Sequence, residues 1–319
     1  METTRTLPEP VPALAMTHGG KFHADDVFST ALLRLLRPDI RVRRGLRVPE
    51  GFEGLVYDIG GGRFDHHQQG APVRANGVPY AAFGLLWREY GPLVLAKGIP
   101  PEAVAEEAAR FDEKFVQPLD RDDNTGCGHL LAEIIGAFNP VWDSEESADR
   151  CFEEAAAFAG VILKKRLEAL FAMYRARTLV EAALARMENG VVVLERFAPW
   201  KGVLVPSAAV FAVYPSQRGG WTAQSVPAEK GGGALKCPFP SAWAGRTEQE
   251  LPAVSGIPGL TFCHNNRFLI AAKTREEAVA ACLAALQAKE REEAASGEKA
   301  GEGAEEEAGE GAKRAKPAL

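Results

Sequence analysis

Short apolar runs alternate with longer segments of helical period over the first part of the chain, and this alternation restricts the fold more than any other feature. The run "PALAMTH" predicts a strand that ends at His18, and "DDVFSTALLRLLR" predicts a helix that stops before Pro38. "DIRVRRG" and "GLVYDIGG" predict two further strands. Strands that alternate with helices favour a parallel sheet covered by helices. Ligands of such sheets bind at the carboxyl ends of the strands, so the residues after each strand are the first candidates for a site.

Two more helices are expected before residue 126. "VPYAAFGLLWREYG" predicts a helix that ends at Gly91. "PPEAVAEEAARFDEKFVQPLDRDDN" predicts another that is closed by Asp120, Asp122 and Asp123 and leads into an acidic loop. From Ser144 to about Glu188 the pattern is helical again. This stretch is longer than an ordinary helix, so two helices and one long connector are both compatible with it.

The pattern changes after Asn189, where short β-type runs are separated by Gly, Pro and Ser. These runs are "GVVVLERF", "KGVLVPS", "AVFAVYPS" and "GGWTAQSVP". "LTFCHNNRFLIAAKT" predicts a hairpin, and a helix is expected after it. We therefore expect an α/β protein, in which a parallel-sheet N-terminal domain is followed by a smaller, sheet-rich α+β domain.

Five segments are expected along the chain. They are an N-terminal extension (1–12), an α/β metal-binding domain (13–143), a helical connector (144–189), an α+β substrate-binding domain (190–288) and an acidic tail (289–319). The tail has nine Glu against six Lys and Arg and no aromatic residue. Such a composition cannot bury enough apolar surface to offset chain entropy, so the sequence predicts a disordered tail.

The composition excludes several classes of protein. No apolar run approaches the roughly 20 residues of a membrane-spanning helix, and the N-terminus lacks the pattern of a signal peptide. The five cysteines include no C-x-x-C pair, which fits reduced thiols in a cytoplasmic protein. The net charge is −6, so a negatively charged substrate needs local positive charge from metal ions or from a few Lys and Arg side chains.

Histidine and aspartate gather at the predicted strand ends. Four of the six histidines lie between residues 18 and 67, interleaved with aspartates, and three more aspartates lie at 120, 122 and 123. Imidazole and carboxylate together suit Mn²⁺, Mg²⁺ or Zn²⁺. Two such ions about 3.5–4 Å apart activate a water molecule and neutralise a phosphate. Each piece also has a plain interpretation: a surface "HH" pair, a helix start at Asp25, a solvated acidic loop, and a helix-start or core histidine at His129.

The run Asp65-His66-His67 resembles the motif that names the DHH phosphoesterase superfamily. More closely, the chain resembles the melanocyte proliferating gene family, metal-dependent hydrolases implicated in 3′→5′ exonuclease action on RNA. The resemblance rests on "THGGKFHADDV", "DIGG", "DHHQ", "FNPVWD", "APWK", "GGWTAQSVP" and "GLTFCHNNRFLIAAKTREEA". It covers all but the first dozen residues and the acidic tail.

The resemblance implies a site built from four segments that holds two divalent ions, Mn²⁺ first and Mg²⁺ or Zn²⁺ as alternatives. The implied metal ligands are His18, His23, Asp25, Asp58, His66, Asp120 and Asp123, and either of the last two matches the fourth segment. Asp58 is the expected bridging carboxylate. Asp65 and His67 are the expected catalytic residues, with His67 orienting the phosphate or giving it a proton.

Two features depart from the superfamily. His23 stands where an aspartate is usual, which bears on the choice of metal. Only six residues separate Asp58 from Asp65, too few for a crossover, so the glycines between them are expected to form a tight hairpin.

The second domain is expected to bind the substrate, RNA or a short oligonucleotide. The resemblance places a Gly- and His-containing loop there, and the implied residues are His264, Asn266, Arg267 and Lys273. Lys201, in "PWKG", is expected to add positive charge. The expected activity is a metal-dependent phosphodiesterase acting as a 3′→5′ exonuclease. The alternatives are a small nucleotide or pyrophosphate phosphatase and a non-catalytic metal- or nucleotide-binding protein. The oligomeric state is left open.

Overall fold

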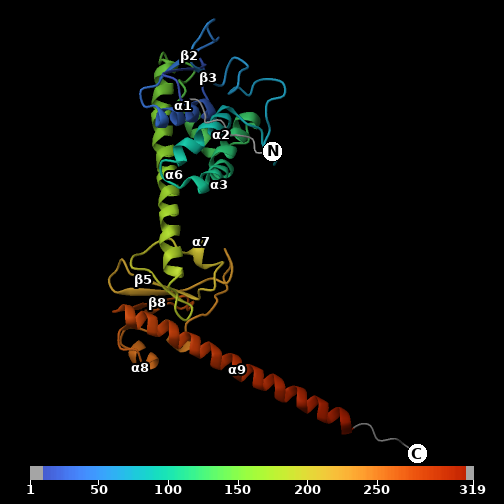
Figure 1. The fold of residues 1–319 in the computed structure, drawn as a ribbon, viewed down its shortest axis with the longest axis vertical. Helices are drawn as coiled ribbons and strands as arrows, with labels where there is room; N and C mark the ends of the chain where they lie inside the picture. Colours follow the sequence, from blue (N-terminus) through green and yellow to red (C-terminus); the bar gives the residue numbers. More distant parts are fainter. Residues whose placement is uncertain (1–9, 314–319) are drawn as a thin grey trace, which may run out of the picture. The chain divides into compact units, whose positions relative to one another are not determined.

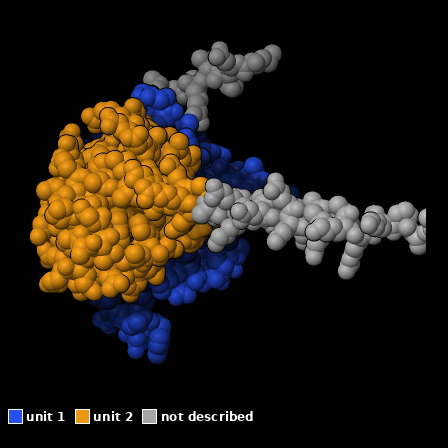
Figure 2. Space-filling model, turned by 90° about the horizontal axis from the view of Figure 1, so that it is seen from below, with its two compact units in different colours: residues 1–172 blue, residues 173–319 orange. Residues whose placement is uncertain are grey.

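The chain folds into two compact units, residues 1–172 and 173–319, shown in Figures 1 and 2. The fold is taken from a computed structural model, which describes the backbone of residues 10–313 and the side chains of residues 10–294. The boundary between the units falls inside helix α6 (Ala148–Leu184), which is one continuous helix of 37 residues. The long helical stretch of the sequence is therefore a single connector, and the expected segment limits stay predictions.

Unit 1 contains a three-stranded parallel sheet. Its strands are β1 (Leu14–His18), β2 (Arg41–Gly45) and β3 (Leu55–Val56), in the order β2-β1-β3. The register pairs His18 with Gly45 and Met16 with Val56, so the carboxyl ends of the strands meet at one edge. The three strands and their parallel direction confirm the pattern expected from the alternating sequence.

Helices surround this sheet. They are α1 (Ala24–Leu36), α2 (Ala82–Leu95), α3 (Pro101–Phe111), a π-helical turn η1 (Asp112–Val116), α4 (Gln117–Thr125) and α5 (Leu130–Gly136). Helix α1 packs against α2, and its first ten residues are all buried. The site is therefore built at the start of a helix that lies inside the unit.

Helix α2 does not end at Gly91, as the sequence suggested. It continues through Pro92 to Leu95, and a Cβ atom at Gly91 would lie 2.6 Å from the ring of Trp87. Side-chain packing within the helix therefore explains the glycine, which is not a termination signal.

The acidic run at 120–123 lies on helix α4, as expected for aspartates that close a helix, and the plain interpretation of this run as a solvated loop is wrong. Helix α4 ends after this run, where Gly126 adopts a φ of 61°, a left-handed conformation that favours glycine. The aspartates are therefore held on a regular helix, which fixes their directions.

The short segment between Asp58 and Asp65 is not the expected tight hairpin. Tyr57 and Phe64 form a parallel bridge, and the Asp58 N–H donates to the Phe64 carbonyl at 3.0 Å. Gly60 and Gly61 have φ values of 88° and 67°, so they allow a loop that brings the chain back in the same direction. Asp58 and Asp65 still lie at the same end of the sheet.

Unit 2 contains a five-stranded mixed sheet. Its strands are β4 (Val191–Val193), β5 (Phe211–Pro215), β6 (Trp221–Ser225), β7 (Leu260–Cys263) and β8 (Leu269–Ala272), in the order β4-β5-β6-β8-β7. Only β4 and β5 pair in parallel within this sheet. The remaining elements are α7 (Lys201–Leu204), the 3₁₀ turn η2 (Ser241–Trp243), α8 (Leu251–Ser255) and α9 (Arg275–Lys313). An α/β fold with a second, sheet-rich unit is thus confirmed.

Two parts of unit 2 differ from the expected pattern. "KGVLVPS" was expected to be β-type, but it forms the short helix α7, because this turn buries Leu204 in the same core as Trp200 and Val192. Helix α9 packs Ala281 against the sheet and continues to Lys313, over most of the segment expected to be disordered.

Residues 1–9 and 314–319 lie outside the described residues. None of the helices in residues 10–313 combines the length and apolar composition that a membrane span needs.

Candidate metal centre

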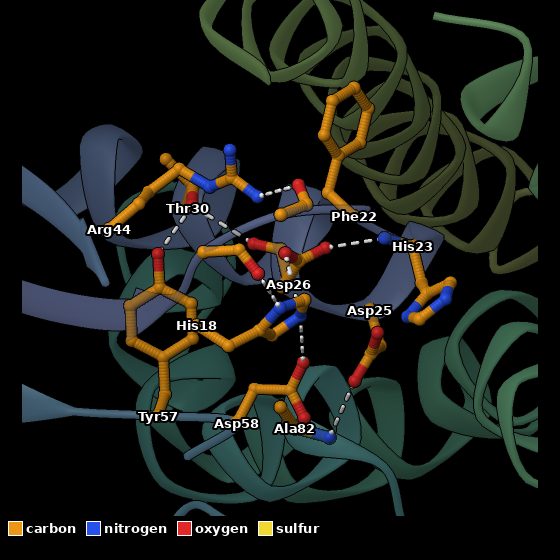
Figure 3. Close-up of polar contacts among 12 residues, drawn as sticks. His18, Phe22, His23, Asp25, Asp26, Thr30, Arg44, Tyr57, Asp58 and Ala82 are labelled. Carbon is orange, nitrogen blue, oxygen red and sulfur yellow. Dashed lines mark hydrogen bonds and ion pairs between the residues drawn. The ribbon is translucent and has the colours of Figure 1, made fainter. Parts of the chain in front are cut away.

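The carboxyl ends of β1 and β3 and the start of α1 bring the candidate ligands together (Figure 3). His18 is the last residue of β1, and Asp58 follows β3, the neighbouring strand. Helix α1 begins after His23 and carries Asp25 and Asp26 in its first turn. These short sequence distances therefore place histidine and aspartate side chains around one space.

The first group of side chains is centred on His18, whose ring lies between two carboxylates in Figure 3. Its Nε2 atom lies 3.2 Å from Asp26 Oδ2 and 3.2 Å from Asp58 Oδ2. Asp26 is fully buried and Asp58 nearly so. The Asp26 carboxylate also accepts a hydrogen bond from the His23 N–H at 2.9 Å, so it fixes the start of α1 as well.

A second group surrounds His66. The Nε2 atom of His66 lies 3.2 Å from Asp58 Oδ1, 3.2 Å from Asp123 Oδ2 and 3.7 Å from Asp25 Oδ2. Asp58 Oδ1 is also 3.4 Å from Nδ1 of His67. Asp58 therefore faces His18 with one oxygen and His66 with the other, the arrangement that a bridging carboxylate requires.

Three sets of residues can each offer three ligand atoms within 4.8 Å of one another. They are His18, Asp26 and Asp58; Asp58, His66 and His67; and His23, Asp25 and Asp123. His23 makes the loosest contact, with its Nδ1 3.9 Å from Asp123 Oδ1. Asp58 belongs to the first two sets, and His66 lies 3.2 Å from Asp123 of the third, so the sets form one connected centre.

Several ligand atoms of this centre are buried but have no hydrogen-bond partner among the described residues. They are Asp25 Oδ1, Asp26 Oδ2, Asp58 Oδ1 and His66 Nε2. Two pairs of atoms, His18 Nε2 with Asp26 Oδ2 and His66 Nε2 with Asp58 Oδ1, lie 3.2 Å apart but lack the angles of a hydrogen bond. Buried polar atoms are rarely left without partners, because losing hydration costs free energy. A divalent cation would satisfy them, and the mixture of imidazole and carboxylate fits Mn²⁺, Zn²⁺ or Mg²⁺. The residues present therefore fit the expected metal ions.

The carboxylates affect one another's protonation. Burial raises the pKa of Asp25 well above its ordinary value, and the negative charges of Asp58 and Asp123 raise it further. Burial lowers the pKa of His18, but Asp26 and Asp58 outweigh this and raise it to about 10. Burial raises the pKa of Asp58, but His18 and His66 hold it below its ordinary value. The protein thus concentrates negative charge that positive charge must compensate.

Asp65 and His67 form a separate pair at the edge of the centre. Asp65 Oδ1 accepts hydrogen bonds from His67 Nδ1 at 2.9 Å and from the His67 N–H at 3.0 Å, and Oδ2 accepts from the Gly61 N–H at 2.7 Å. Burial raises the pKa of Asp65, but these hydrogen bonds outweigh burial and hold the pKa below its ordinary value. Because Asp65 is an acceptor, Nδ1 of His67 carries a proton. The His67 side chain is 61% exposed, so Nε2 is left for other partners.

Asp120 is not brought into the centre with the other candidates. Its carboxylate accepts a hydrogen bond from Arg74 Nη2 at 2.8 Å and one from the Gly84 N–H at 3.1 Å. The Arg74 guanidinium also donates two hydrogen bonds to the Asp112 carboxylate. A Cβ atom at Gly84 would lie 1.9 Å from Asp120, so glycine is needed there. Of the acidic run, Asp123 is the residue that faces the histidines.

The candidate substrate residues lie in unit 2. His264, Asn266 and Arg267 share the turn between β7 and β8, where the Asn266 N–H donates to His264 Nδ1 at 3.0 Å. Arg267 has a φ of 58°, a left-handed conformation that completes the turn. Lys273 makes an ion pair with Glu248 at 3.0 Å. Lys201 begins α7, with its ammonium 5.9 Å from the centre of the Trp200 ring.

Sequence reasoning missed three residues around the site. Asp26 was passed over in favour of its neighbour Asp25, although two consecutive carboxylates in "HADD" were a visible signal. Asn139, in "FNPVWD", accepts a hydrogen bond from the Phe22 N–H at 3.0 Å and donates to the Phe22 carbonyl at 2.9 Å. Arg74 had no signal in the sequence. His129 is the residue before α5, which agrees with the helix-start interpretation.

Comparison with known proteins identifies relatives along almost the whole chain. Residues 14–286 match the family model MYG1_exonuc, described as "Uncharacterised protein family (UPF0160)". The chain is 30% identical over 319 residues to "MYG1 exonuclease" from Homo sapiens, covering 85% of each chain. It is 29% identical over 320 residues to "MYG1 exonuclease" from Bos taurus, covering 85% of this chain and 84% of the relative. It is 26% identical over 314 residues to "MYG1 protein" from Dictyostelium discoideum, covering 85% of this chain and 95% of the relative.

No solved structure matches the chain. The family match spans both compact units, and the relatives align over most of their own length. The chain therefore belongs to the MYG1 exonuclease family, also called the melanocyte proliferating gene family.

Proposed function

We propose that this protein is a divalent-metal-dependent phosphodiesterase that removes nucleotides from the 3′ end of RNA or short oligonucleotides. The observation that carries the proposal is the buried centre of histidines and aspartates, with ligand atoms that lack partners among the described residues. The relatives from Homo sapiens and Bos taurus are named exonucleases, which supports a nucleic-acid substrate. All five cysteines are free, which agrees with the reducing cytoplasm that we propose as its compartment.

Two Mn²⁺ ions are the proposed cofactors, with Mg²⁺ or Zn²⁺ as alternatives. His18 and Asp26 would hold one side of the centre, His66 and Asp123 would hold the other, and Asp58 would serve both. When bound, such ions neutralise the charge of a phosphate and lower the pKa of a water molecule. His23 and Asp25 complete the set on the α1 side.

The Asp65–His67 pair is proposed to transfer a proton during hydrolysis. Hydrolysis adds water to phosphorus and releases an oxygen of the neighbouring nucleotide, and that oxygen needs a proton. His67 has its Nδ1 hydrogen held by Asp65 and its side chain largely exposed. When the ring is protonated on both nitrogens, Nε2 is our candidate for giving that proton, which leaves a neutral ring with its hydrogen on Nδ1, and Asp65 is the residue that orients the ring.

The turn between β7 and β8 is the proposed phosphate-binding element of unit 2. Because Nδ1 of His264 accepts from Asn266, the proton of the neutral ring lies on Nε2, which is then a donor. A donated hydrogen bond to a charged oxygen contributes on the order of 1.5–3 kcal/mol. His264→Ala is expected to weaken oligonucleotide cleavage about ten- to a hundredfold. It is expected to leave metal content and the turnover of a minimal chromogenic phosphodiester unchanged, so loss of metal would contradict this assignment.

One experiment tests the activity itself. RNA labelled at its 5′ end is incubated with the protein and Mn²⁺, Mg²⁺, Zn²⁺ or EDTA, and the products are separated by length. The expected result is a ladder that shortens from the 3′ end with a divalent ion and no cleavage in EDTA. Turnover of free nucleotides or pyrophosphate without cleavage of RNA would replace the proposal with a small-molecule phosphatase. Binding without any turnover would replace it with a non-catalytic binding protein.

A further inference from the structure

The segment from Arg34 to Arg47 has a charge unlike that of the chain around it. "RLLRPDIRVRRGLR" contains six arginines and one aspartate, a net charge of 6 − 1 = +5 in a chain whose net charge is −6. It runs from the end of α1 through the edge strand β2 into the following loop. A positive segment this dense in an acidic protein calls for a physical explanation.

Three of the six arginines are explained by ion pairs. Arg34 pairs with Glu153 at 2.8 Å, Arg37 with Asp39 at 3.3 Å and Arg44 with Asp149 at 2.8 Å. The guanidinium of Arg44 also lies 4.5 Å from the centre of the Phe152 ring and donates to the Gly20 carbonyl at 2.8 Å. Arg34 and Arg44 hold α1 and β2 against α6, and Arg37 also donates to the Val11 carbonyl, so the role of all three is structural.

The other three arginines have no such role. Arg41, Arg43 and Arg47 are exposed, and no carboxylate or ring among the side chains of residues 10–294 contacts their guanidinium groups. Arg41 and Arg43 point to the same face of β2, because side chains alternate along a strand. Exposed guanidinium groups without partners can donate paired hydrogen bonds to phosphate oxygens.

These arginines lead toward the metal centre. The sheet register pairs Gly45 with His18, and the Gly19 N–H donates to the Gly45 carbonyl at 2.8 Å. Arg43 is two residues before that point, about 6.6 Å along the strand, and Arg47 is two residues beyond it. The loop after His18 also carries Lys21, which is exposed and has no side-chain partner among the described residues. Arg43, Arg47 and Lys21 therefore lie within two or three residues of the edge at which the ligands gather, and Arg41 lies two residues before Arg43, at the start of β2.

We propose that Arg41, Arg43, Arg47 and Lys21 bind the phosphodiester backbone of a single-stranded nucleic acid on its way to the metal centre. The inference rests on the proposed function and names the surface that receives its substrate. The argument is charge complementarity: a polyanion that approaches an acidic protein needs positive side chains along its path, and these four have no side-chain partner among the described residues. Glu50 and Glu53, which follow Arg47 along the chain, are exposed and negatively charged, so the positive surface ends before them.

The salt dependence of binding tests this surface. The variant Arg41→Ala/Arg43→Ala/Arg47→Ala is compared with a control, Arg150→Ala/Lys164→Ala/Lys165→Ala, which removes three exposed positive charges from α6 in unit 1. Binding of a fluorescent single-stranded oligoribonucleotide is measured in EDTA over a range of salt concentrations. Each phosphate contact contributes about 0.7 to the slope of log affinity against log salt, so the slope should fall by about 2 in the first variant. Its affinity at low salt should fall roughly tenfold or more, while the control and an Arg-to-Lys triple variant keep the slope of the original protein.

The outcomes separate this inference from the proposed function. If the triple Ala variant keeps the original slope, the surface assignment is wrong, whatever the enzyme assay shows. If the unmodified protein cleaves neither RNA nor a minimal phosphodiester with any metal, the proposed function is wrong, and the binding assay still decides the surface. If polyglutamate of equal charge competes as well as the oligonucleotide, the surface is a site for acidic polypeptides and the inference is overturned.

Discussion

Asp58 has a position that no other residue of the centre shares. One of its oxygens faces His18 and the other faces His66 and His67. Asp58 also has a φ of 58°, an uncommon conformation for a residue other than glycine, which indicates that the surroundings hold it in place. A substitution that keeps its shape and removes its charge is therefore the most direct probe of the centre.

Asp58→Asn is expected to fold normally and to lose activity by orders of magnitude, because the residue that both sides of the centre share no longer carries a charge. Metal analysis of the purified variant should show reduced Mn²⁺ content. A variant that still holds two tightly bound ions would contradict the bridging role.

Asp120 and Asp123 lie one helical turn apart on α4 but have different partners. Asp123→Asn should lower the affinity for Mn²⁺, since Asp123 faces His66 at 3.2 Å. Asp120→Asn should leave metal binding intact and destabilise the fold by about 3–5 kcal/mol, because it breaks a buried ion pair with Arg74. Metal titration and urea unfolding of the two variants check this. Equal effects in both assays would argue against the distinction.

At the scale of elements, the loop between β1 and α1 depends on a residue far along the chain. Both backbone polar groups of Phe22 bond to the side chain of Asn139, and the buried ring of Phe22 packs edge-on against Phe152 at 5.6 Å. This loop carries His18 at one end and His23 at the other. Asn139 therefore acts as a positioning residue, which gives "FNPVWD" a physical role.

Asn139→Ala is expected to weaken Mn²⁺ binding severalfold and to cost about 1–3 kcal/mol of stability, because two backbone groups lose their partner. Asn76→Ala, which removes an exposed bond to Gln117 and a longer one from the Val78 N–H, is the matched control and should leave Mn²⁺ binding unchanged. Calorimetric titration with Mn²⁺ measures the first effect and thermal unfolding the second. A variant that loses stability but binds Mn²⁺ with unchanged affinity would show that Asn139 supports only the fold.

The elements that could be predicted from sequence were those whose signal is local. β1 and α1 were predicted because their apolar spacing and their ends lie in adjacent residues. Helix α7 was not, because "VLV" favours a strand locally and only burial of Leu204 beside Trp200 decides for a helix. The choice between Asp120 and Asp123 likewise depends on Arg74, which comes from 46 residues earlier, so no pattern within "LDRDDN" could reveal it.

For the molecule as a whole, the acidic tail raises the question of where the folded part ends. Lys289 still donates to the Lys236 carbonyl at 2.9 Å, whereas residues 290–294 are all exposed. Truncation after Lys289 should therefore leave the melting temperature and turnover nearly unchanged, as the composition of the tail already suggested. A fall of several degrees in melting temperature would show that the tail packs against the folded part.

The continuous helix α6 has a consequence for how this protein can be divided. Phe152 and Leu163 belong to the core of unit 1, while Val180 and Ala183, on the same helix, belong to a core of unit 2. A fragment that stops at residue 172 would end in the middle of hydrogen-bonded turns, and the other fragment would begin without the turns that precede it. The two units are therefore poor candidates for independent expression, or for exchange with other proteins as interchangeable modules.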